Sequence, residues 1–269
     1  MVKKGKFLLS ISIFLVLTIS LFSFSVYASD DSGSDVSSTL LMNQKILGEK
    51  SFSSPIWAGY TVSKIDTNGL PQEKSVNFVT GSWIVPSVDC SSTPNGYVAI
   101  WVGIDGYGSS TIEQIGTNSQ CDNGKQLIYA WWETYPDPSK KINYFPVKPG
   151  DNIKAQVEFI GNKKFNLTIT NLNTGKTFSK IKKVPDAQRT SGEWIIEAPQ
   201  VQSQIQPLAN FNSVTFTNAQ AKIKGTMGKI NNPSWRNYEI DMVGDSVLKA
   251  DTSPLTSSGD SFNVTWMHS

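Results

Sequence analysis

Histidine is almost absent from this chain of 269 residues, and that absence excludes much of hydrolase chemistry. The single histidine, His268, stands next to the C-terminal residue. A Ser-His-Asp or Cys-His hydrolase needs a buried, oriented imidazole, which a chain terminus is badly placed to supply. Zinc sites built on several histidines, including the HExxH helix, are excluded by the same count, and no metal site is predicted. Carboxylate and amide chemistry is what remains.

The chain also lacks a phosphate-binding loop and a strong excess of charge. No glycine-rich loop follows a strand and opens a helix, so nucleotide chemistry has no support and no cofactor is expected. The 24 basic and 22 acidic residues nearly cancel. Lysines cluster at residues 180–183, but a short basic run is typical of a solvated strand or turn. We therefore predict no nucleic-acid partner.

Only one hydrophobic run is long enough to suggest a targeting segment, and it lies at the N-terminus. Three lysines precede an apolar stretch over residues 7–26, and Ala28 closes a small-residue cleavage pattern. This arrangement predicts a signal peptide over residues 1–28, a secreted, extracellular protein and no membrane contact after removal of the signal. The alternative is an uncleaved anchor, because the stretch approaches the roughly 20 residues that span a bilayer.

The cysteine content is limited to Cys90 and Cys121. In an exported chain an even number of cysteines favours a disulfide. Both lie in polar, turn-rich stretches, so the bond is expected to tie two loops together. Without a CxxC spacing the pair is a poor metal site, and two free thiols are the alternative.

Long stretches with helical periodicity are missing as well. Short strand-like runs with Gly and Pro between them recur instead: Ile56–Val62, Val76–Val85, Val98–Ile104, Gln126–Glu133, Ile153–Ile160, Phe165–Thr170, Glu193–Glu197, Ser213–Thr217, Tyr238–Met242 and Phe262–Trp266. Many short strands at close spacing predict an all-β fold, an antiparallel sandwich or barrel, in a single domain over residues 52–269. Residues 29–51 are polar and are interpreted as a spacer or a short pro-segment.

Alternation within these strands sorts their residues onto two faces, because successive side chains point to opposite sides. The aliphatic residues of 98–104 form one side of their strand, and Trp194 and Ile196 point inward from theirs. The opposite face combines aromatic rings with carboxylates from three strands: Trp101 and Asp105; Tyr129, Trp131, Glu133 and Tyr135; Glu193 and Glu197. We interpret this face as lying outside the core and as suited to an extended polymer, either a peptide or a glycan.

Several segments resemble the glutamic peptidases of family G1, the eqolisins. They are residues 100–106 (IWVGIDG), 114–116 (QIG), 131–137 (WWETYPD) and 193–197 (EWIIE), with 81–86 (GSWIVP) before them and 211–219 (FNSVTFTNA) after them. The resemblance runs in order from about residue 57 to the C-terminus. It implies a β-sandwich of two large antiparallel sheets, similar to the concanavalin A-like lectins and glucanases. It also implies endopeptidase cleavage of polypeptides at acidic pH, and a monomer is expected.

The resemblance places the family's catalytic glutamine at Gln114 and its catalytic glutamate at Glu193. Other matched positions are expected to bind substrate: Trp101, Asp105, Trp131, Glu133 and Tyr135. A glutamate can take a proton from water and, once protonated, return it to the leaving nitrogen. A neighbouring amide can orient the water and stabilise the oxyanion without adding a charge.

Two other functions stay open at this point. A glycoside hydrolase could use Glu193 and Glu197 as acid and nucleophile. Four residues along a strand separate their Cα atoms by about 13 Å, whereas a retaining pair needs carboxyl groups about 5 to 5.5 Å apart. A non-catalytic, lectin-like binding protein would need only the aromatic face.

Overall fold

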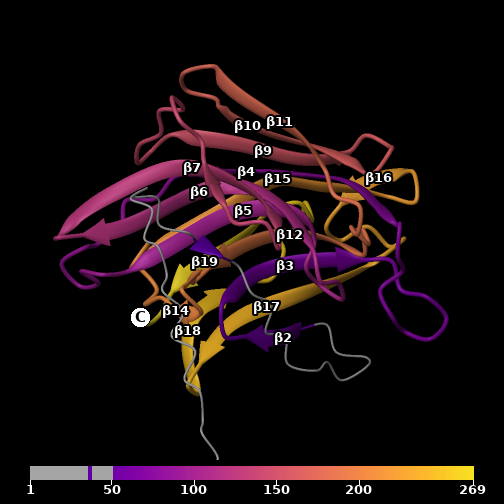
Figure 1. The fold of residues 1–269 in the computed structure, drawn as a ribbon. Helices are drawn as coiled ribbons and strands as arrows, with labels where there is room; N and C mark the ends of the chain where they lie inside the picture. The colour runs from indigo at the N-terminus through magenta and orange to yellow at the C-terminus, as the bar shows by residue number, and fades with distance from the viewer. Residues whose placement is uncertain (1–35, 38–50) are drawn as a thin grey trace, which may run out of the picture. The chain divides into compact units, whose positions relative to one another are not determined.

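The structure, a computed structural model, describes residues 36–37 and 51–269 (Figure 1). Every regular element in this part of the chain is a β-strand, and none of its residues forms a helix that could cross a membrane. In chain order the strands are β1 (Val36–Ser37), β2 (Ser51–Ser54), β3 (Trp57–Ser63), β4 (Val76–Ile84), β5 (Tyr97–Asp105), β6 (Ile112–Asp122), β7 (Lys125–Tyr135), β8 (Lys140–Lys141), β9 (Asn152–Phe159), β10 (Lys164–Asn171), β11 (Lys176–Lys183), β12 (Ser191–Glu197), β13 (Gln200–Val201), β14 (Gln204–Ile205), β15 (Ser213–Ile223), β16 (Thr226–Lys229), β17 (Arg236–Gly244), β18 (Val247–Thr252) and β19 (Phe262–Trp266).

The strands form two layers that share one strand. One layer contains β17, β3, β12, β5, β6 and β7 in that order, and the other contains β11, β10, β9, β4 and β15. Strand β15 joins the layers, because its residues 213–216 pair with β19 and its residues from Thr217 onward pair with β4. Strand β4 contacts β5, and β9 contacts both β5 and β6. Figure 1 shows β9, β10 and β11 on one side of the fold and β3 and β17 on the other. The predicted antiparallel β-sandwich is confirmed.

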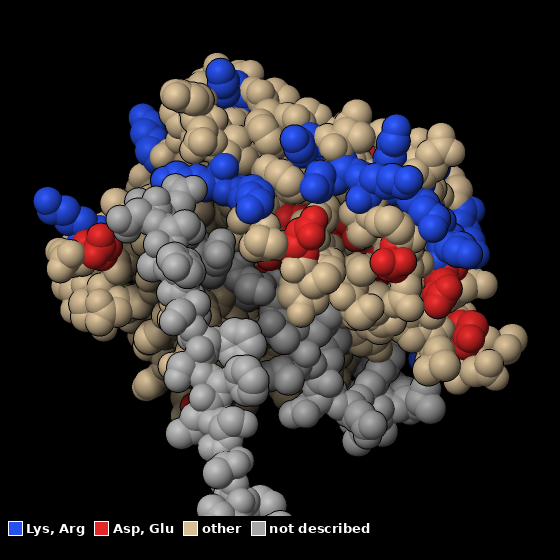
Figure 2. Space-filling view, viewed as in Figure 1, with Lys and Arg blue, Asp and Glu red and all other residues tan. Residues whose placement is uncertain are grey.

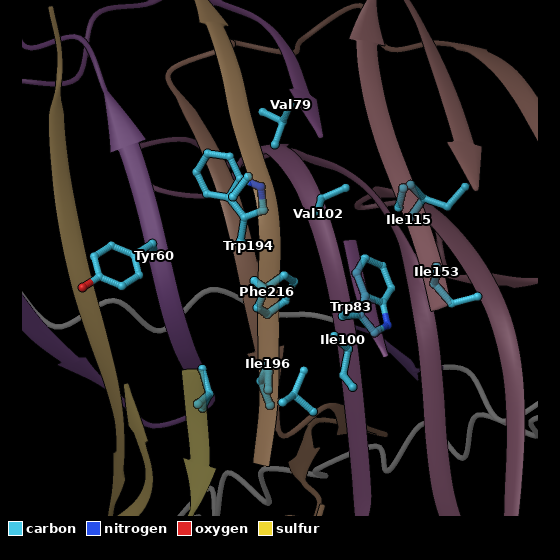
Figure 3. Packing of buried hydrophobic residues seen from close by; sticks show 14 of the residues in the cluster. Tyr60, Val79, Trp83, Ile100, Val102, Ile115, Ile153, Trp194, Ile196 and Phe216 are labelled. Atoms are coloured by element: carbon cyan, nitrogen blue, oxygen red, sulfur yellow. The ribbon is translucent and has the colours of Figure 1, made fainter. Parts of the chain in front are cut away.

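The main hydrophobic core fills the space between the layers. The aliphatic residues of β5 from Val98 to Ile104 point into it, together with Trp194 and Ile196 of β12. Figure 3 shows Trp194 in this core with Trp83 and Phe216. Each buried aliphatic side chain of this kind stabilises the fold by about 1.5–3 kcal/mol. The core positions that alternation predicts are therefore confirmed.

Each run predicted as a strand is a strand in the structure, but β6 is not predicted by the sequence. Its residues 117–120 are polar and have weak strand preference. Strand β6 nevertheless pairs along its whole length with β5 on one side and β7 on the other. Tertiary pairing thus overrides the local preference, and it does so in the strand that carries Gln114.

Cys90 and Cys121 form the predicted disulfide. The prediction that it ties two loops together is wrong, because Cys121 lies in β6. The bond joins the loop that contains Cys90 to a strand of the sheet. Polar residues around Cys121 are typical of a turn, but here their side chains belong to a paired strand.

The predicted signal peptide, residues 1–28, lies outside the described residues, as does nearly all of the predicted spacer, residues 29–51. Both assignments stay predictions, and so does the domain boundary at residue 52.

Candidate active site

The face of the β3–β12–β5–β6–β7 sheet that points away from the main core carries a second hydrophobic cluster. Trp57, Trp101, Trp131 and Ile195 belong to it, and Tyr135 packs against it. This face lies outside the main core, but the expectation that it is not buried is wrong, since Trp101 is 0% and Trp131 is 3% exposed. The predicted sorting of residues between the two faces is correct.

Strand register brings the predicted catalytic residues into one row across this face. Glu193 of β12 is opposite Gly103 of β5, and Gly103 is opposite Gln114 of β6. Two strand spacings separate the Cα atoms of Glu193 and Gln114 by about 10 Å. Glu133 of β7 is the next residue in the row, opposite Gln114.

Glycine at position 103 keeps the space between these two side chains open. A Cβ atom there would lie 2.9 Å from Cζ3 of Trp101 and 3.3 Å from Cβ of Gln114. Any larger residue would enter the gap between Glu193 and Gln114. The row therefore has no side chain between the carboxyl group of Glu193 and the amide of Gln114.

Glu193 is completely buried, and its two carboxyl oxygens have different surroundings. Oε1 accepts hydrogen bonds from the backbone N–H of Tyr107 at 2.8 Å and from the hydroxyl of Ser191 at 3.0 Å. Oε2 has no hydrogen-bond partner within the described part of the chain. Burial raises the pKa of Glu193 well above its ordinary value, while the hydrogen bonds from Ser191 and Tyr107 oppose the rise. One oxygen is thus anchored, and a proton is held more tightly than on a solvated glutamate.

Glycine also allows the approach of the loop that anchors Glu193. Gly106 has φ of +113°, and a Cβ atom there would lie 2.6 Å from Oε2 of Glu193. The next residue, Tyr107, supplies the backbone donor to Oε1. Sequence reasoning did not find Tyr107 or Ser191. Ser191 could have been found, since residues two apart in a strand share a face.

Gln114 is completely buried, and its Nε2 donates a hydrogen bond to Oε2 of Glu133. This bond fixes how the amide plane of Gln114 is turned. Glu133 therefore acts on the neighbouring amide, and its predicted contact with substrate stays a prediction.

Asp105 ends β5, two residues after Gly103, and is completely buried. It holds the chain that leads into β12. Its carboxylate accepts hydrogen bonds from the backbone N–H groups of Arg189 and Thr190, both at 2.7 Å, and from the hydroxyl of Thr111 at 3.2 Å. Burial raises the pKa of Asp105, and these hydrogen bonds oppose the rise. These contacts assign Asp105 to positioning the loop before Glu193, and its predicted contact with substrate stays a prediction.

Trp101 and Glu197 form a second polar contact on the same face. Nε1 of Trp101 donates to Oε2 of Glu197 at 2.8 Å, and the Trp101 ring meets the Trp57 ring edge-on at 5.3 Å between centroids. Burial raises the pKa of Glu197 to about 7. Glu197 lies four residues from Glu193 along the same strand and is held by an indole, so the two carboxylates do not face each other across a sugar-sized gap.

Trp131 and Tyr135 extend the face toward the edge of the sheet. Trp131 of β7 is opposite Gly116 of β6, which in turn is opposite Trp101. Tyr135 ends β7 and packs against the second cluster. The structure therefore places all the predicted site residues on one face, with Trp101 and Trp131 as its floor one row from the Glu193 and Gln114 row.

Two solved structures share this fold. Scytalido-glutamic peptidase, determined with a transition state analog inhibitor, matches with a TM-score of 0.67 at 23% identity over 79% of this chain and 98% of that chain. The aspergilloglutamic peptidase from Aspergillus niger matches with a TM-score of 0.58 at 31% identity over 64% of this chain and 99% of that chain. The fold is therefore that of the glutamic peptidases.

Comparison of this amino-acid sequence with known proteins shows the family of the chain. The model of the Peptidase A4 family matches residues 55–266. Aspergillopepsin-2 from Aspergillus niger is 34% identical over 213 residues, which cover 70% of this chain and 72% of that protein. The chain belongs to the Peptidase A4 family, the G1 glutamic peptidases, and is a peptide hydrolase. The predicted resemblance is confirmed.

Proposed function

We propose that this protein is a secreted, monomeric endopeptidase that cleaves at acidic pH with Glu193 and Gln114 as its catalytic pair. One observation carries the proposal. Glu193 has one oxygen anchored and the other without a partner in the described residues, and only Gly103 stands between it and Gln114 in the sheet row.

Peptide hydrolysis follows from these two groups. The ionised Glu193 takes a proton from a water molecule, and the water oxygen bonds to the carbonyl carbon of the scissile peptide. The Gln114 amide donates a hydrogen bond to the oxyanion that forms. Protonated Glu193 then gives its proton to the peptide nitrogen, and the C–N bond breaks. No other proton donor is required.

The surroundings of Glu193 support catalysis in weakly acidic solution. The raised pKa lets the group keep and deliver a proton at pH values where a solvated glutamate, with a pKa near about 4.3, is already ionised. An amide partner also avoids the repulsion between two carboxylates that would compete for one proton. We therefore expect the rate to peak below neutral pH and above the ordinary glutamate value.

Two side chains support the pair. Glu133 orients the Gln114 amide, and Trp101, fixed by Glu197, forms part of the substrate floor. A glycoside hydrolase using Glu193 and Glu197 is not favoured, because the second carboxylate is engaged by Trp101 and lies two rows away. A binding protein without catalysis is not favoured for a chain of a peptidase family.

The test compares variants of the purified mature protein on an unfolded protein substrate between pH 3 and 7. Glu193→Gln removes the proton-transfer group and is expected to lower kcat by about 10²- to 10⁴-fold. Gln114→Ala removes the oxyanion donor and is expected to lower kcat by about 10²- to 10³-fold. Chelators and serine or cysteine reagents should leave the wild-type rate unchanged.

Glu158→Gln is the matched control, because Glu158 is an exposed strand carboxylate on the other layer. Its activity should equal that of the wild type. Full activity of either active-site variant, or loss of activity with EDTA, would show that the catalytic assignment is wrong.

A further inference from the structure

The active-site face is the face of the β3–β12–β5–β6–β7 sheet that carries Glu193, Gln114 and the second hydrophobic cluster. Strand β8 adds one positive charge to it. Its two residues pair with β7 so that Lys141 is opposite Trp131 and Lys140 is opposite Trp132. Trp131 belongs to the cluster on the active-site face, whereas Trp132 packs against the main core. Because paired residues in a sheet share a face, Lys141 lies on the active-site face and Lys140 on the opposite one.

A contact of Lys141 agrees with this placement. Nζ of Lys141 lies 4.9 Å from the centroid of the Tyr129 ring, another member of the active-site face. Lys141 is exposed, and the ion pairs within the described residues are Lys182 with Asp137 and Lys229 with Asp260. Its ammonium group is therefore held over an aromatic ring and is not neutralised by a carboxylate of the described chain.

The segment of the chain that contains β8 is rich in lysine. Residues 125–183 contain eleven lysines and four acidic residues, of which Glu133 and Asp151 are buried. Figure 2 shows Lys and Arg side chains gathered in a band across the upper half of the view. Positive charge on a surface attracts negatively charged chains and repels positive ones.

We propose that Lys141, with Tyr129 and Trp131, forms a subsite that selects an acidic side chain of the polypeptide substrate. The inference rests on the proposed function, because it names a substrate preference of that same site. Lys141 lies two strands beyond Gln114 and one row along, so their Cα atoms are about 12 Å apart. An extended peptide covers this distance in three to four residues at about 3.3 Å each. The acidic residue is thus the third or fourth from the cleaved bond, on the Gln114 side.

A lysine on an edge strand also discourages pairing with another sheet. That task does not require the lysine to face the cleft, and Lys140 on the same strand performs it equally well. The two residues therefore separate the subsite from edge protection. Only the side chain on the active-site face can select substrate.

The experiment digests a mixed peptide library with the mature protein at pH 5 and maps the cleaved bonds by mass spectrometry. Wild type is expected to show Asp and Glu enriched about 2- to 5-fold at one position, three to four residues from the cleaved bond, as an exposed ion pair allows. Lys141→Gln should abolish this enrichment, and Lys141→Glu should replace it with Lys and Arg. Lys140→Gln is the matched control and should keep the wild-type pattern.

Each result decides the matter. Loss of the enrichment in Lys141→Gln but not in Lys140→Gln supports the subsite. Cleavage by wild type without the enrichment, or the same enrichment in Lys141→Gln, overturns the subsite and leaves the proposed function intact. Absence of any cleavage by wild type overturns the proposed function and the subsite with it.

Discussion

Adjacent residues of β12 occupy two faces of one sheet with opposite consequences. Trp194 is buried between the layers, where its indole N–H donates to the Thr80 carbonyl at 2.8 Å. Glu193, one residue away, is equally buried on the other face, yet one of its oxygens has no partner in the described chain. Burial stabilises the first side chain and raises the pKa of the second.

Burial alone therefore does not distinguish the core from the candidate active site. Burial of an apolar or fully hydrogen-bonded side chain stabilises the folded state. Burial of a carboxyl group with an open hydrogen-bonding position destabilises it. Buried acids such as Glu193, and Glu113 on the core face, therefore weaken the fold as they ionise, and the apolar side chains of the core compensate. Substitutions that exchange these properties test the distinction.

Trp194→Ala should have the largest effect on stability. It removes a completely buried ring and its hydrogen bond, so we expect the free energy of unfolding to fall by about 3–5 kcal/mol. Urea unfolding at pH 5 measures the loss. Trp132→Ala is the control, because Trp132 is only partly buried, and it should lose less than half as much. Equal losses would contradict the assignment of Trp194 to the main core.

Glu197→Leu should have an intermediate effect. It leaves the buried Nε1–H of Trp101 without its acceptor, so we expect stability to fall by about 1–3 kcal/mol and kcat/KM to fall with it. Glu197→Gln keeps an oxygen acceptor and resembles the protonated acid that predominates below pH 7, so it should spare both quantities. Urea unfolding and peptide cleavage at pH 5 provide the measurements. If Glu197→Gln abolishes cleavage, Glu197 takes part in the chemistry itself.

Glu113→Gln should have the smallest effect, and only at neutral pH. Glu113 faces the interior, is 0% exposed, and neither of its oxygens has a partner among the described residues. Burial, followed by repulsion from Asp105, raises its pKa well above the ordinary value. The folded state therefore binds more protons than the unfolded state, and stability falls as pH rises from about 4.3 toward the raised pKa.

We expect Glu113→Gln to match the wild type at pH 3.5 and to exceed it by about 1 kcal/mol or more at pH 7. Urea unfolding at the two pH values measures this difference. The exposed Glu158→Gln should show no such dependence. A Glu113→Gln variant that is less stable than the wild type at pH 7, relative to their difference at pH 3.5, would refute the sign of the argument.

Local pattern was sufficient for much of the fold. The alternation in β5 and β12 sorts Ile100 and Trp194 from Trp101 and Glu193 correctly, because a period of two is a property of the strand itself. The polar residues of β6 defeat the same reasoning, since that strand exists through pairing with β5 and β7. The prediction that Cys121 lies in a loop is wrong for the same reason, because Cys121 belongs to β6.

The candidate active site shows the same division between local pattern and tertiary contact. The resemblance to the glutamic peptidases points to Gln114 and Glu193, but it does not show that Tyr107 and Ser191 anchor the carboxylate or that Glu133 turns the amide. These contacts join strands and loops that are distant in the chain. Their geometry depends on register and loop path, which no local window contains.

The amino-acid sequence by itself determined the β class, the face on which each strand residue lies and the absence of histidine chemistry, because these depend on composition and on neighbours along the chain. Only the tertiary structure decided that Gly103 separates Glu193 from Gln114, that the active-site face is buried and that Lys141 stands at its edge. Those properties arise from strands distant in sequence, whose pairing sets both the distances between side chains and their shielding from water.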